Sequence, residues 1–419
     1  MQTIRETALL LSSLSVYKGI LSRTVPAAFH RLLRAADGSP EEFVRAWGDF
    51  FSLLCDRGCS RAFARCFTET AFYDENAFSR AAAAGKFEEL PAPVLDAAVR
   101  DLSVIRRAAA LTPDDLLSGF GHRKELGGVA DTLPRWENGE PAPALAGELS
   151  ACVARMAGYY AKNGCGMYAR YRAFLWRGGK IEPIPYPDPI RMEELKCYDA
   201  PRALVEDNTA AFVRGLPANN CLLYGDRGTG KSSTVKALLN RYCGDGLRMI
   251  EMPKEALCDF PALVEAIAAL SLRFIVFIDD LSFSRQDDSY AALKAVLEGG
   301  LASRPENALI YATSNRRHLV RECFSDREGD EVHRGDTLQE SLSLADRFGL
   351  AVHFGTPAKA EYLAIVNALA DERALSCDRA LLEQSAERWA LSRGGRSPRC
   401  ARQFVQMAQS RLLRGLPLD

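Results

Sequence analysis

Apolar residues in the first part of the chain recur with the period of a helix. Around residue 50 they stand three or four positions apart, at Phe43, Trp47, Phe50, Phe51 and Leu54. Residues at this spacing share one face of an α-helix, so the pattern predicts amphipathic helices on a common core. The pattern extends from residue 1 to about residue 176, interrupted by a polar, turn-rich stretch between residues 127 and 143.

Downstream, apolar residues gather in short continuous runs. Five such runs alternate with helical patterns: Cys221–Tyr224, Leu247–Met252, Arg273–Ile278, Ala308–Thr313 and Leu350–Phe354. Runs of this length indicate strands buried on both faces, and strands that alternate with helices form an open parallel sheet. The sequence therefore predicts an α/β fold with a five-stranded parallel sheet.

Proline and a return of the helical period predict the remaining boundaries. The segment Pro183–Pro189 cannot continue a helix and indicates an extended linker. From Pro357 onward the pattern is wholly helical, with helices expected near residues 358–371, 379–391 and 398–413. The parts that we expect are a mainly helical N-terminal domain (1–182), a proline-rich linker (183–196), an α/β nucleotide-binding subdomain (197–356) and a C-terminal helical lid (357–419).

Composition narrows the class of protein. Of the 419 residues, 47% are apolar and 26% are charged, and the net charge is −1. A chain so close to neutral gives no global indication of binding to nucleic acid or to an anionic membrane. No apolar run reaches the roughly 18 residues of a membrane span. The run Leu9–Leu11 follows Arg5 and Glu6, as in an amphipathic helix and not a signal peptide, so we expect a cytoplasmic protein with no membrane partner.

Twelve cysteines are scattered along the chain, and the tightest group is Cys55, Cys59 and Cys66. No CxxC pair occurs and the nearest histidine is His30, whereas zinc sites use closely spaced Cys and His ligands. We expect the cysteines to be small buried apolar residues in a reducing compartment. A metal site at this group is the alternative that we do not favour.

A glycine-rich loop follows the first predicted strand. From Gly225 to Ser232 it has the spacing GxxxxGK followed by Ser or Thr, and it opens a predicted helix over residues 232–239. Glycines let successive N–H groups point inward and the helix N-terminus adds partial positive charge, so the loop favours phosphate. Lys231 is expected to reach the β- and γ-phosphates, and Ser232 to ligate Mg²⁺. The residues expected to hold the nucleotide are Gly225, Asp226, Arg227, Gly228, Thr229, Gly230, Lys231, Ser232 and Ser233. A glycine-rich turn before a helix is the alternative.

Two carboxylates end the strand predicted at Phe274–Ile278. Asp279 and Asp280 are placed at the carboxyl edge of the sheet, where ligands bind in open α/β folds. Asp279 is expected to hold Mg²⁺ through water, because Mg²⁺ keeps several waters, and Asp280 to polarise an attacking water. Two solvated acids at a strand end are the alternative, which the phosphate loop earlier in the chain disfavours.

The fourth predicted strand also ends in a polar side chain. Asn315 follows Ala312–Ser314 and could hydrogen-bond the attacking water or the γ-phosphate. A helix N-cap or turn is the other common use of an asparagine at such a place. The acidic and basic stretch 322–340, with His333, is expected to be an exposed loop.

An aromatic-rich segment before the linker is predicted to be one helix. Its members are Tyr159, Tyr160, Tyr168, Tyr171, Phe174 and Trp176, with Arg170, Arg172 and Arg177 beside them. Such a surface could stack nucleic-acid bases. A packing face with arginines at its rim is more common, and it is the arrangement that we expect.

The order of these motifs resembles that of AAA+ ATPases. The strings YGDRGTGKSS, IDDLSF, YATSNRRHL and LADRFGL are most similar to a bacterial family of predicted AAA+-type ATP-binding proteins with no assigned cellular role. The resemblance covers residues from about 195 to 419, and segment 392–399 also resembles the sensor 2 region of the Holliday-junction branch-migration motor. It implies a P-loop AAA+ module, with the glycine-rich loop as Walker A and Asp279–Asp280 as Walker B.

The resemblance also implies roles for single residues. Asn315 takes the sensor 1 position, and Arg347 that of the arginine finger, which reaches the ATP of a neighbouring subunit; the pair Arg316–Arg317 is a rival for the finger. Arg399 takes the sensor 2 position and touches the γ-phosphate from the lid. Arginine suits such positions because its planar, permanently charged group neutralises charge on phosphate oxygens. Tyr198 lies where such modules often place an adenine-contacting residue. Pairing of Arg347 with nearby acids, and a purely local role for Arg399, are the alternatives.

One position departs from the AAA+ pattern. Asp280 stands where these enzymes usually carry glutamate, and its carboxylate lies one methylene farther from the attacking water. Because catalysis depends on placement within fractions of an ångström, we expect ATP and Mg²⁺ to bind but turnover to be slow, or to need a partner.

The sequence thus predicts an ATP hydrolase of the AAA+ type that drives conformational change of an oligomer. The finger implies a homo-oligomer, for which a ring is one form, and the helical N-terminal domain is the expected binding part for an unknown protein client. Two alternatives stay open. One is a nucleotide-gated switch or scaffold with little turnover, suggested by Asp280. The other is a DNA-associated loader or remodeller, which the near-neutral charge does not favour.

Overall fold

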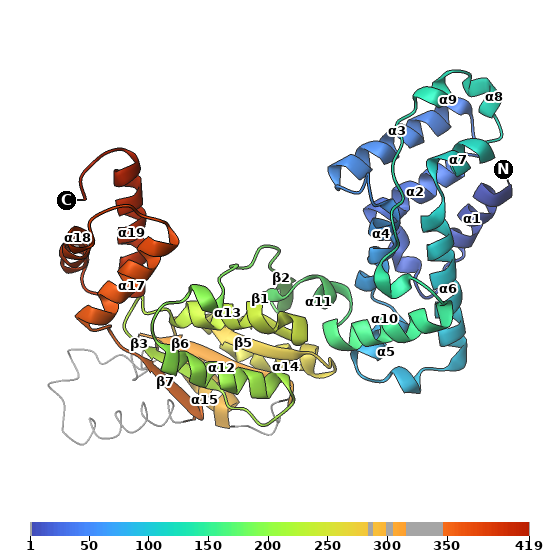
Figure 1. The fold of residues 1–419 in the computed structure, drawn as a ribbon. Helices are drawn as coiled ribbons and strands as arrows, with labels where there is room; N and C mark the ends of the chain where they lie inside the picture. Colours follow the sequence, from blue (N-terminus) through green and yellow to red (C-terminus); the bar gives the residue numbers. More distant parts are fainter. Residues whose placement is uncertain (1, 284–287, 299–304, 316–346, 419) are drawn as a thin grey trace. The chain divides into compact units, whose positions relative to one another are not determined.

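The computed structural model describes residues 2–283, 288–298, 305–315 and 347–418. Contacts within the chain divide it into two units, drawn in Figure 1 from blue to red along the sequence. The first unit comprises residues 1–170 together with 270–272, and the second comprises residues 171–269 and 273–419. Among the described residues, no helix is both long enough and apolar enough to cross a membrane.

The first unit is helical. Its α-helices are α1 Gln2–Ser12, α2 Thr24–Ala35, α3 Pro40–Asp56, α4 Phe63–Thr68, α5 Ala77–Ala83, α6 Ala92–Ala110, α7 Pro113–Gly119, α8 Arg123–Leu126, α9 Val129–Thr132, α10 Leu149–Asn163 and α11 Gly166–Arg170. Short 3₁₀ turns lie at Lys18–Ser22, Glu69–Tyr73, Phe87–Glu89 and Pro143–Leu145. Hydroxyl N-caps followed by proline fix where α3 and α7 begin, at Ser39 and Thr112, because each side chain accepts a backbone N–H of the first turn.

An aromatic core holds these helices together. The rings of Phe29 and Phe63 lie 4.7 Å apart between centroids, and Phe50 meets Trp136 edge-on at 5.0 Å. Tilted and edge-to-face contacts of this kind suit the charge distribution of aromatic rings. The predicted helical stripe is confirmed, since Phe43, Trp47, Phe50 and Leu54 are fully buried while Phe51 is half-buried.

Two buried polar clusters of the first unit are hydrogen-bonded within the fold. Asp101 is fully buried and accepts the backbone N–H groups of Ser15 at 2.9 Å and Tyr17 at 3.0 Å. The hydroxyl of Tyr160 donates to the carbonyl of Ala71 at 2.5 Å and lies 3.4 Å from that of Tyr17. Burial is the main reason that the pKa values of both tyrosines lie above their ordinary value.

The second unit is built on a sheet that has seven strands among the described residues, in the order β2-β1-β4-β5-β6-β3-β7. They are β1 Ala173–Arg177, β2 Lys180–Pro183, β3 Cys221–Gly225, β4 Leu247–Glu251, β5 Arg273–Ile278, β6 Ala308–Ser314 and β7 Leu350–Phe354. All neighbours are parallel except β1 and β2. The five predicted parallel strands are confirmed as β3 to β7.

Helices flank this sheet (Figure 1). They are α12 Asp199–Val213, α13 Lys231–Tyr242, α14 Phe260–Ala268 and α15 Asp288–Glu298, with 3₁₀ turns at Met192–Glu194, Cys243–Asp245 and Lys254–Asp259. Alternate strand residues such as Leu223 and Ile275 share one core with Val205 of α12 and Leu238 of α13. This is the period of two that a pleated strand imposes.

The predicted single aromatic helix before the linker is wrong, because α10 ends at Asn163, the short α11 covers only Gly166–Arg170, and a strand follows. Phe174 and Trp176 lie on β1, which turns back as β2 through Gly178 and Gly179. Both glycines have left-handed backbone angles, φ +55° and +73°, as a two-residue hairpin turn requires. Phe174 is fully buried and Trp176 is 2% exposed, so neither ring is available to stack a base.

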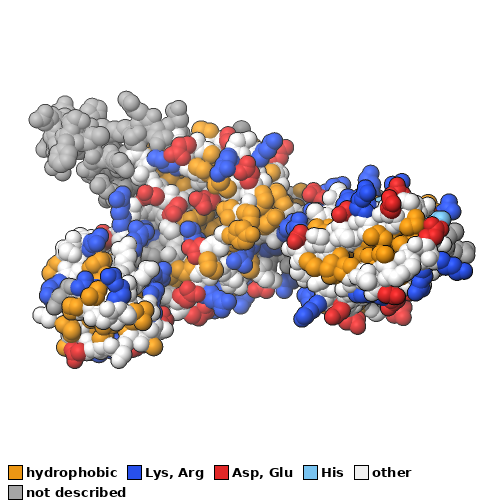
Figure 2. Space-filling model, turned by 90° about the horizontal axis from the view of Figure 1, so that it is seen from above, with side chains coloured by type: hydrophobic (Ala, Val, Ile, Leu, Met, Phe, Trp, Pro, Cys, Tyr) orange, Lys and Arg blue, Asp and Glu red, His pale blue; other side chains and the backbone are white. Residues whose placement is uncertain are grey.

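The lid consists of three helices after β7, and all three predicted helices are confirmed. They are α17 Lys359–Glu372, α18 Arg379–Ser392 and α19 Pro398–Leu413, packed around a small apolar core of their own. Ser397 caps α19 by accepting the N–H of Cys400 at 3.1 Å, with Pro398 in the first turn. On the face drawn in Figure 2, basic and acidic side chains are interspersed.

Candidate functional site

The glycine-rich loop joins β3 to α13. Glycine is required at two of its positions, Gly225 and Gly230, for different structural reasons. Gly225 has φ +131°, and a Cβ there would overlap the carbonyl of Phe354 on the neighbouring strand β7. Gly230 has φ +99°, and no atom lies within 4 Å of the place a Cβ would take. Gly225 therefore permits close strand packing, whereas Gly230 leaves space open at the N-terminus of α13.

Lys231 lies at the start of α13 and is 7% exposed. Its ammonium group donates to the carbonyls of Gly225 at 2.8 Å and Asp226 at 2.7 Å, and Asn315 Oδ1 lies 3.5 Å away. Burial lowers the pKa of Lys231, and the nearby carboxylates oppose that shift. The curled loop thus holds a desolvated cation within its turn, where an anion would compete for it.

Ser232 and Asp279 meet across the sheet edge. The hydroxyl of Ser232 donates to Asp279 Oδ1 at 2.6 Å, and the hydroxyl of Thr313 donates to the same oxygen at 2.5 Å. Thr313 reaches it because β5 and β6 run parallel in register, with Ile278 beside Ala312. The two hydroxyls hold the Asp279 carboxylate at the start of α13, so that it lies beside the oxygen of Ser232.

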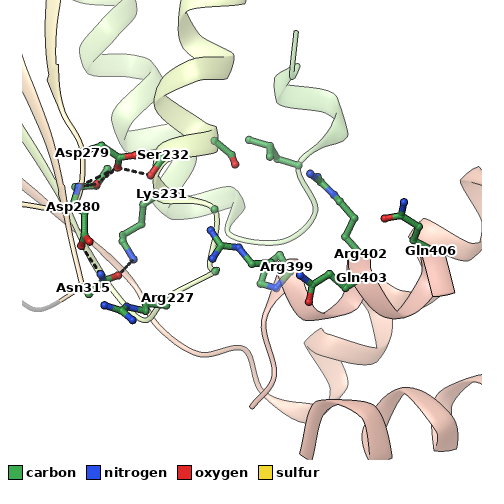
Figure 3. A pocket seen from close by; sticks show the side chains of 16 residues that line it. Arg227, Lys231, Ser232, Asp279, Asp280, Asn315, Arg399, Arg402, Gln403 and Gln406 are labelled. Carbon is green, nitrogen blue, oxygen red and sulfur yellow. Dashed lines mark hydrogen bonds between the residues drawn. The ribbon is translucent and has the colours of Figure 1, made fainter. Parts of the chain in front are cut away.

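Asp280 has a left-handed backbone, with φ +53°, which is uncommon for a residue other than glycine. Its N–H donates to Thr313 Oγ1 at 2.9 Å, and its carboxylate accepts the amide of Asn315 at 2.6 Å. Backbone strain of this kind concentrates at functional sites. The turn points the two adjacent carboxylates at different partners, Asp279 at Ser232 and Asp280 at Asn315 (Figure 3).

These residues line a cavity of about 740 Å³ whose other wall is the lid. Arg399, Arg402, Gln403 and Gln406 face it from α19, at the spacing of one helix face (Figure 3). The opposite face of α19 carries residues such as Phe404 in the lid core. The loop and lid touch directly, since the N–H of Arg399 donates to the carbonyl of Gly228 at 3.2 Å.

A second, smaller cavity adjoins the first. Its lining combines the apolar and aromatic groups of Tyr198, Phe354, Ile365 and Leu369 with polar and charged ones such as Glu194, Lys196 and Arg202. It shares Leu195, Gly230, Pro398 and Arg402 with the first cavity. The Tyr198 ring lies 5.4 Å from that of Phe354, and its hydroxyl donates to the carbonyl of Gly355 at 2.6 Å. Cys197 and Tyr198 are both left-handed, held by the guanidinium of Arg202, which donates to the carbonyls of Leu195 and Cys197.

Most predicted site residues are brought together around the first cavity. Those that line it are Arg227, Gly228, Gly230, Lys231, Ser232, Ser233, Asp279, Asp280, Asn315 and Arg399. Gly225 and Asp226 are not among the lining residues, and Thr229 and Tyr198 line the second cavity. The Asp226 carboxylate instead accepts the hydroxyl of Thr356 at 2.5 Å and its N–H at 3.1 Å.

Arg347 is not brought to the cavity. It lies half-buried just before β7, whose first residue Leu350 pairs with Cys221 and whose last residue Phe354 pairs with Gly225. Five residues of parallel strand, roughly 15 Å, therefore separate the level of Arg347 from that of the loop. The rival pair Arg316–Arg317, and the predicted exposed loop 322–340, lie outside the described residues.

Three contributors were missed by sequence reasoning. Thr313 and Thr356 hold Asp279 and Asp226, and only the strand register shows these contacts. Arg402 had a signal in the sequence, because it follows Arg399 by three positions on a predicted helix and so shares its face.

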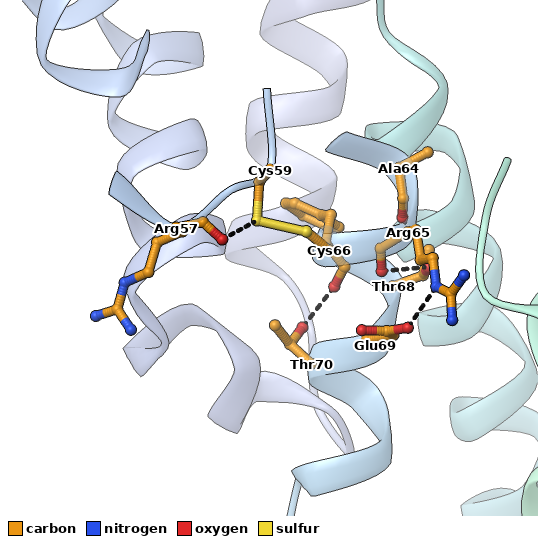
Figure 4. Close-up of a disulfide and its surroundings, with 9 residues drawn as sticks. Arg57, Cys59, Ala64, Arg65, Cys66, Thr68, Glu69 and Thr70 are labelled. Carbon is orange, nitrogen blue, oxygen red and sulfur yellow. Dashed lines mark hydrogen bonds and ion pairs between the residues drawn. A yellow bond between two sulfur atoms is a disulfide. The ribbon is translucent and has the colours of Figure 1, made fainter. Parts of the chain in front are cut away.

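The cysteine group corrects a second expectation. Cys59 and Cys66 form a disulfide in the first unit, next to α4 (Figure 4). Their Cα atoms are 6.1 Å apart, within the range that a disulfide spans. Cys55 is exposed and not bonded to this pair. The expectation that all the cysteines are free thiols was therefore wrong for this pair.

A protein-family model described as "Protein of unknown function (DUF815)" matches residues 169–412, which is more than half of the chain. Among solved structures, the Holliday junction branch migration motor RuvB of Thermotoga maritima is similar at 16% identity, over 54% of this chain and 66% of that chain, with a TM-score of 0.38. Two of its mutants match at 17% and 14% identity, over 54% and 55% of this chain and 67% and 66% of theirs, with TM-scores of 0.38 and 0.36. The chain thus spans about two thirds of the length of these RuvB chains, and likeness at this level says nothing about the chemistry of the site. No curated protein matches the chain.

Proposed function

We propose that this chain, which belongs to the DUF815 family, is an AAA+-type protein that binds ATP with Mg²⁺ and hydrolyses it slowly to move its lid. The observation that carries the proposal is one cavity shared by Lys231, Ser232, Asp279, Asp280 and Asn315 on the sheet side and by arginines of the lid on the other. A turn that merely preceded a helix would not explain the carboxylates and amide gathered opposite it.

The lining fits magnesium-bound triphosphate in charge. Four cationic side chains line the cavity against two carboxylates: Arg227, Lys231, Arg399 and Arg402 against Asp279 and Asp280. The net positive balance complements an anion that remains negative after binding one divalent cation. The serine and carboxylate oxygens held 2.6 Å apart are the hard oxygen donors that Mg²⁺ uses.

Each residue then has a defined task. Bound ATP would supply the phosphoanhydride bond that water cleaves. The loop N–H groups and Lys231 would hold the phosphates, and the Ser232–Asp279 pair would hold the metal. Asp280 would take the proton from water, and Asn315, already bonded to it, would orient that carboxylate.

The Asp280–Asn315 hydrogen bond supports slow turnover. This hydrogen bond, 2.6 Å long, occupies one carboxylate oxygen of Asp280, whose short side chain must also reach the attacking water. If the remaining oxygen of Asp280 cannot reach the water while Asn315 holds the other, the protein would be a nucleotide-gated switch, which is the second candidate. The two candidates differ in rate and not in binding.

The smaller cavity marks where the base would enter. It holds only about 30 Å³ in this structure, so a flat heterocycle would bind there only after the surrounding side chains or the lid move apart. Tyr198 and Phe354 offer flat apolar faces there, and the shared residues at the boundary would allow one ligand to span both cavities. Arg347 lies before β7, whose far end pairs with the loop of the same chain. This position agrees with contact between Arg347 and the ATP of a neighbouring subunit in a homo-oligomer. The aromatic segment before the linker no longer supports a DNA-associated role, since Phe174 and Trp176 are buried.

The first test is calorimetric titration of the protein with MgATP, followed by steady-state hydrolysis at rising protein concentration. Lys231→Ala should abolish measurable binding, and Lys236→Ala, on the same helix but outside the cavity lining, should not change it. A specific rate that climbs with concentration supports sites completed between subunits. Binding without turnover above the Lys231→Ala blank at any concentration selects the switch, and wild type that binds no nucleotide refutes the proposal.

A further inference from the structure

Arginines of the lid fall into two groups by their partners. Arg396 is paired with Glu387 through two hydrogen bonds, at 2.8 and 2.9 Å, and Arg373 donates to Gln409 at 2.8 Å. Within the described part of the chain, the guanidinium groups of Arg399 and Arg402 make no hydrogen bond or ion pair, and both line the large cavity. The fold has therefore used the first group and left the second group available to a ligand.

Arg402 occupies a place that Arg399 does not. It lines both cavities, whereas Arg399 lines only the larger one. Arg399 is held against the loop through the carbonyl of Gly228, and Arg402 lies one turn farther along α19, about 4.5 Å in axial rise. Arg402 thus lies at the junction between the large cavity and the small one.

We propose that Arg402 is a second nucleotide-binding arginine of the lid, one that contacts the part common to ATP and ADP. The inference rests on the proposed function, because it takes the phosphates to lie at Lys231 and the base at Tyr198. A ligand placed so has its α-phosphate and sugar at the junction where Arg402 stands. A planar guanidinium can donate two hydrogen bonds to phosphate oxygens there.

Arg399 and Arg402 would then contact different parts of the nucleotide. Arg399 responds to the γ-phosphate and so separates ATP from ADP. Arg402 responds to any bound adenine nucleotide and keeps the lid on the loop after hydrolysis. Loss of Arg402 should weaken ATP and ADP by a similar factor, whereas loss of Arg399 should weaken ATP more than ADP.

Calorimetric titration of the full chain with MgATP and with MgADP tests this division. Arg402→Gln should weaken both ligands at least about tenfold, since the guanidinium donates up to two charge-assisted hydrogen bonds, and Arg402→Lys should recover part of the loss. Arg399→Gln should lower the ATP-to-ADP affinity ratio, and Arg402→Gln should leave that ratio unchanged. Arg414→Gln makes the same charge change just beyond α19 and outside both cavities, so its affinities should equal those of wild type.

Three results overturn the inference. Arg402→Gln that binds both nucleotides like wild type shows that the arginine is an unused surface group, while the proposed function stands. Arg402→Gln that weakens ATP alone shows that it duplicates Arg399. Wild type that binds neither nucleotide refutes the proposed function itself, and this inference with it.

Discussion

A buried polar residue of each unit illustrates a different use of such groups, one structural and one available to a ligand. In the first unit, fully buried Asp101 accepts the backbone N–H groups of Ser15 and Tyr17 and a guanidinium N–H of Arg100, and the backbone bonds join the segment after α1 to α6. In the second unit, Lys231 is almost as buried, but it lies in the lining of a cavity together with exposed Asp279. Asp101 completes the fold of the first unit, whereas Lys231 is available to a ligand in the second unit.

This difference tells where function is to be sought. A buried group whose hydrogen bonds are all made within the protein stabilises one structure, and it has few free donors or acceptors for a ligand. A buried cation whose partners are loop carbonyls can exchange them for a phosphate. Substitutions in the first unit should therefore change stability, and those around the cavity should change affinity.

The largest effect is expected from Phe63→Ala in the aromatic core of the first unit. Removing a fully buried ring that packs on Phe29, Phe50 and Trp136 should cost about 3–5 kcal/mol of the free energy of unfolding. Amide hydrogen exchange, which localises the loss to residues 1–170, measures it. Phe51→Ala, at a half-buried position of the same core, should cost clearly less. A parallel drop in MgATP affinity while the protein is folded would break the comparison.

The next effect is expected at the loop. Gly225→Ala combines a positive φ with overlap on the carbonyl of Phe354, for a loss of roughly 2–5 kcal/mol. Gly230→Ala has the positive φ but open space, so it should lose only about 1–3 kcal/mol. Thermal unfolding of the two variants side by side gives the contrast. Equal losses would mean that the close approach of β3 and β7 is relaxed in solution.

A smaller effect is expected from Thr356→Val, which removes the hydroxyl that holds Asp226. The carboxylate keeps only the N–H of residue 356, so the loop should loosen from the chain that leads into the lid, at a loss of about 1–2 kcal/mol. Thr356→Ser retains the hydroxyl and should behave like wild type. Since Asp226 does not line the large cavity, ATP affinity should fall less than stability does. The outcome that contradicts this assignment is a large affinity loss with unchanged unfolding temperature.

The smallest effect is one of pH. Burial lowers the pKa of His30, whose ring nitrogen lies 2.9 Å from Ser12 Oγ. The unfolded chain then takes up the proton first as the pH falls through about 6.5, so the stability of the first unit should decline toward pH 5. Solvent screening of a half-buried ring keeps the decline below about 1 kcal/mol. Unfolding at pH 7 and pH 5 measures it, and His30→Gln should flatten the difference while leaving nucleotide affinity untouched.

Several elements could be predicted from the chain alone, for identifiable reasons. The strand β5 matches its predicted range because a continuous apolar run marks a strand buried on both faces. The strand β7 also matches its predicted range, although it is exposed at Ala351 and His353. The start of α19 matches because Ser397 and Pro398 form an N-cap and first turn. The hairpin β1–β2 was missed because aromatic residues also fit a helix, although the Gly178–Gly179 turn carried the opposite signal.

Local spacing fixes which chemical groups lie at the loop, because the motif places Lys231 and Ser232 on the first turn of one helix. An apolar run that ends in two acids likewise places Asp279 and Asp280 at a strand end. The contacts of Thr313 with Asp279 and of Thr356 with Asp226, and the position of Arg402 at both cavities, follow from the folded structure alone. Such contacts join residues distant along the chain, and they depend on strand register and on which face a lid helix buries, neither of which local spacing fixes.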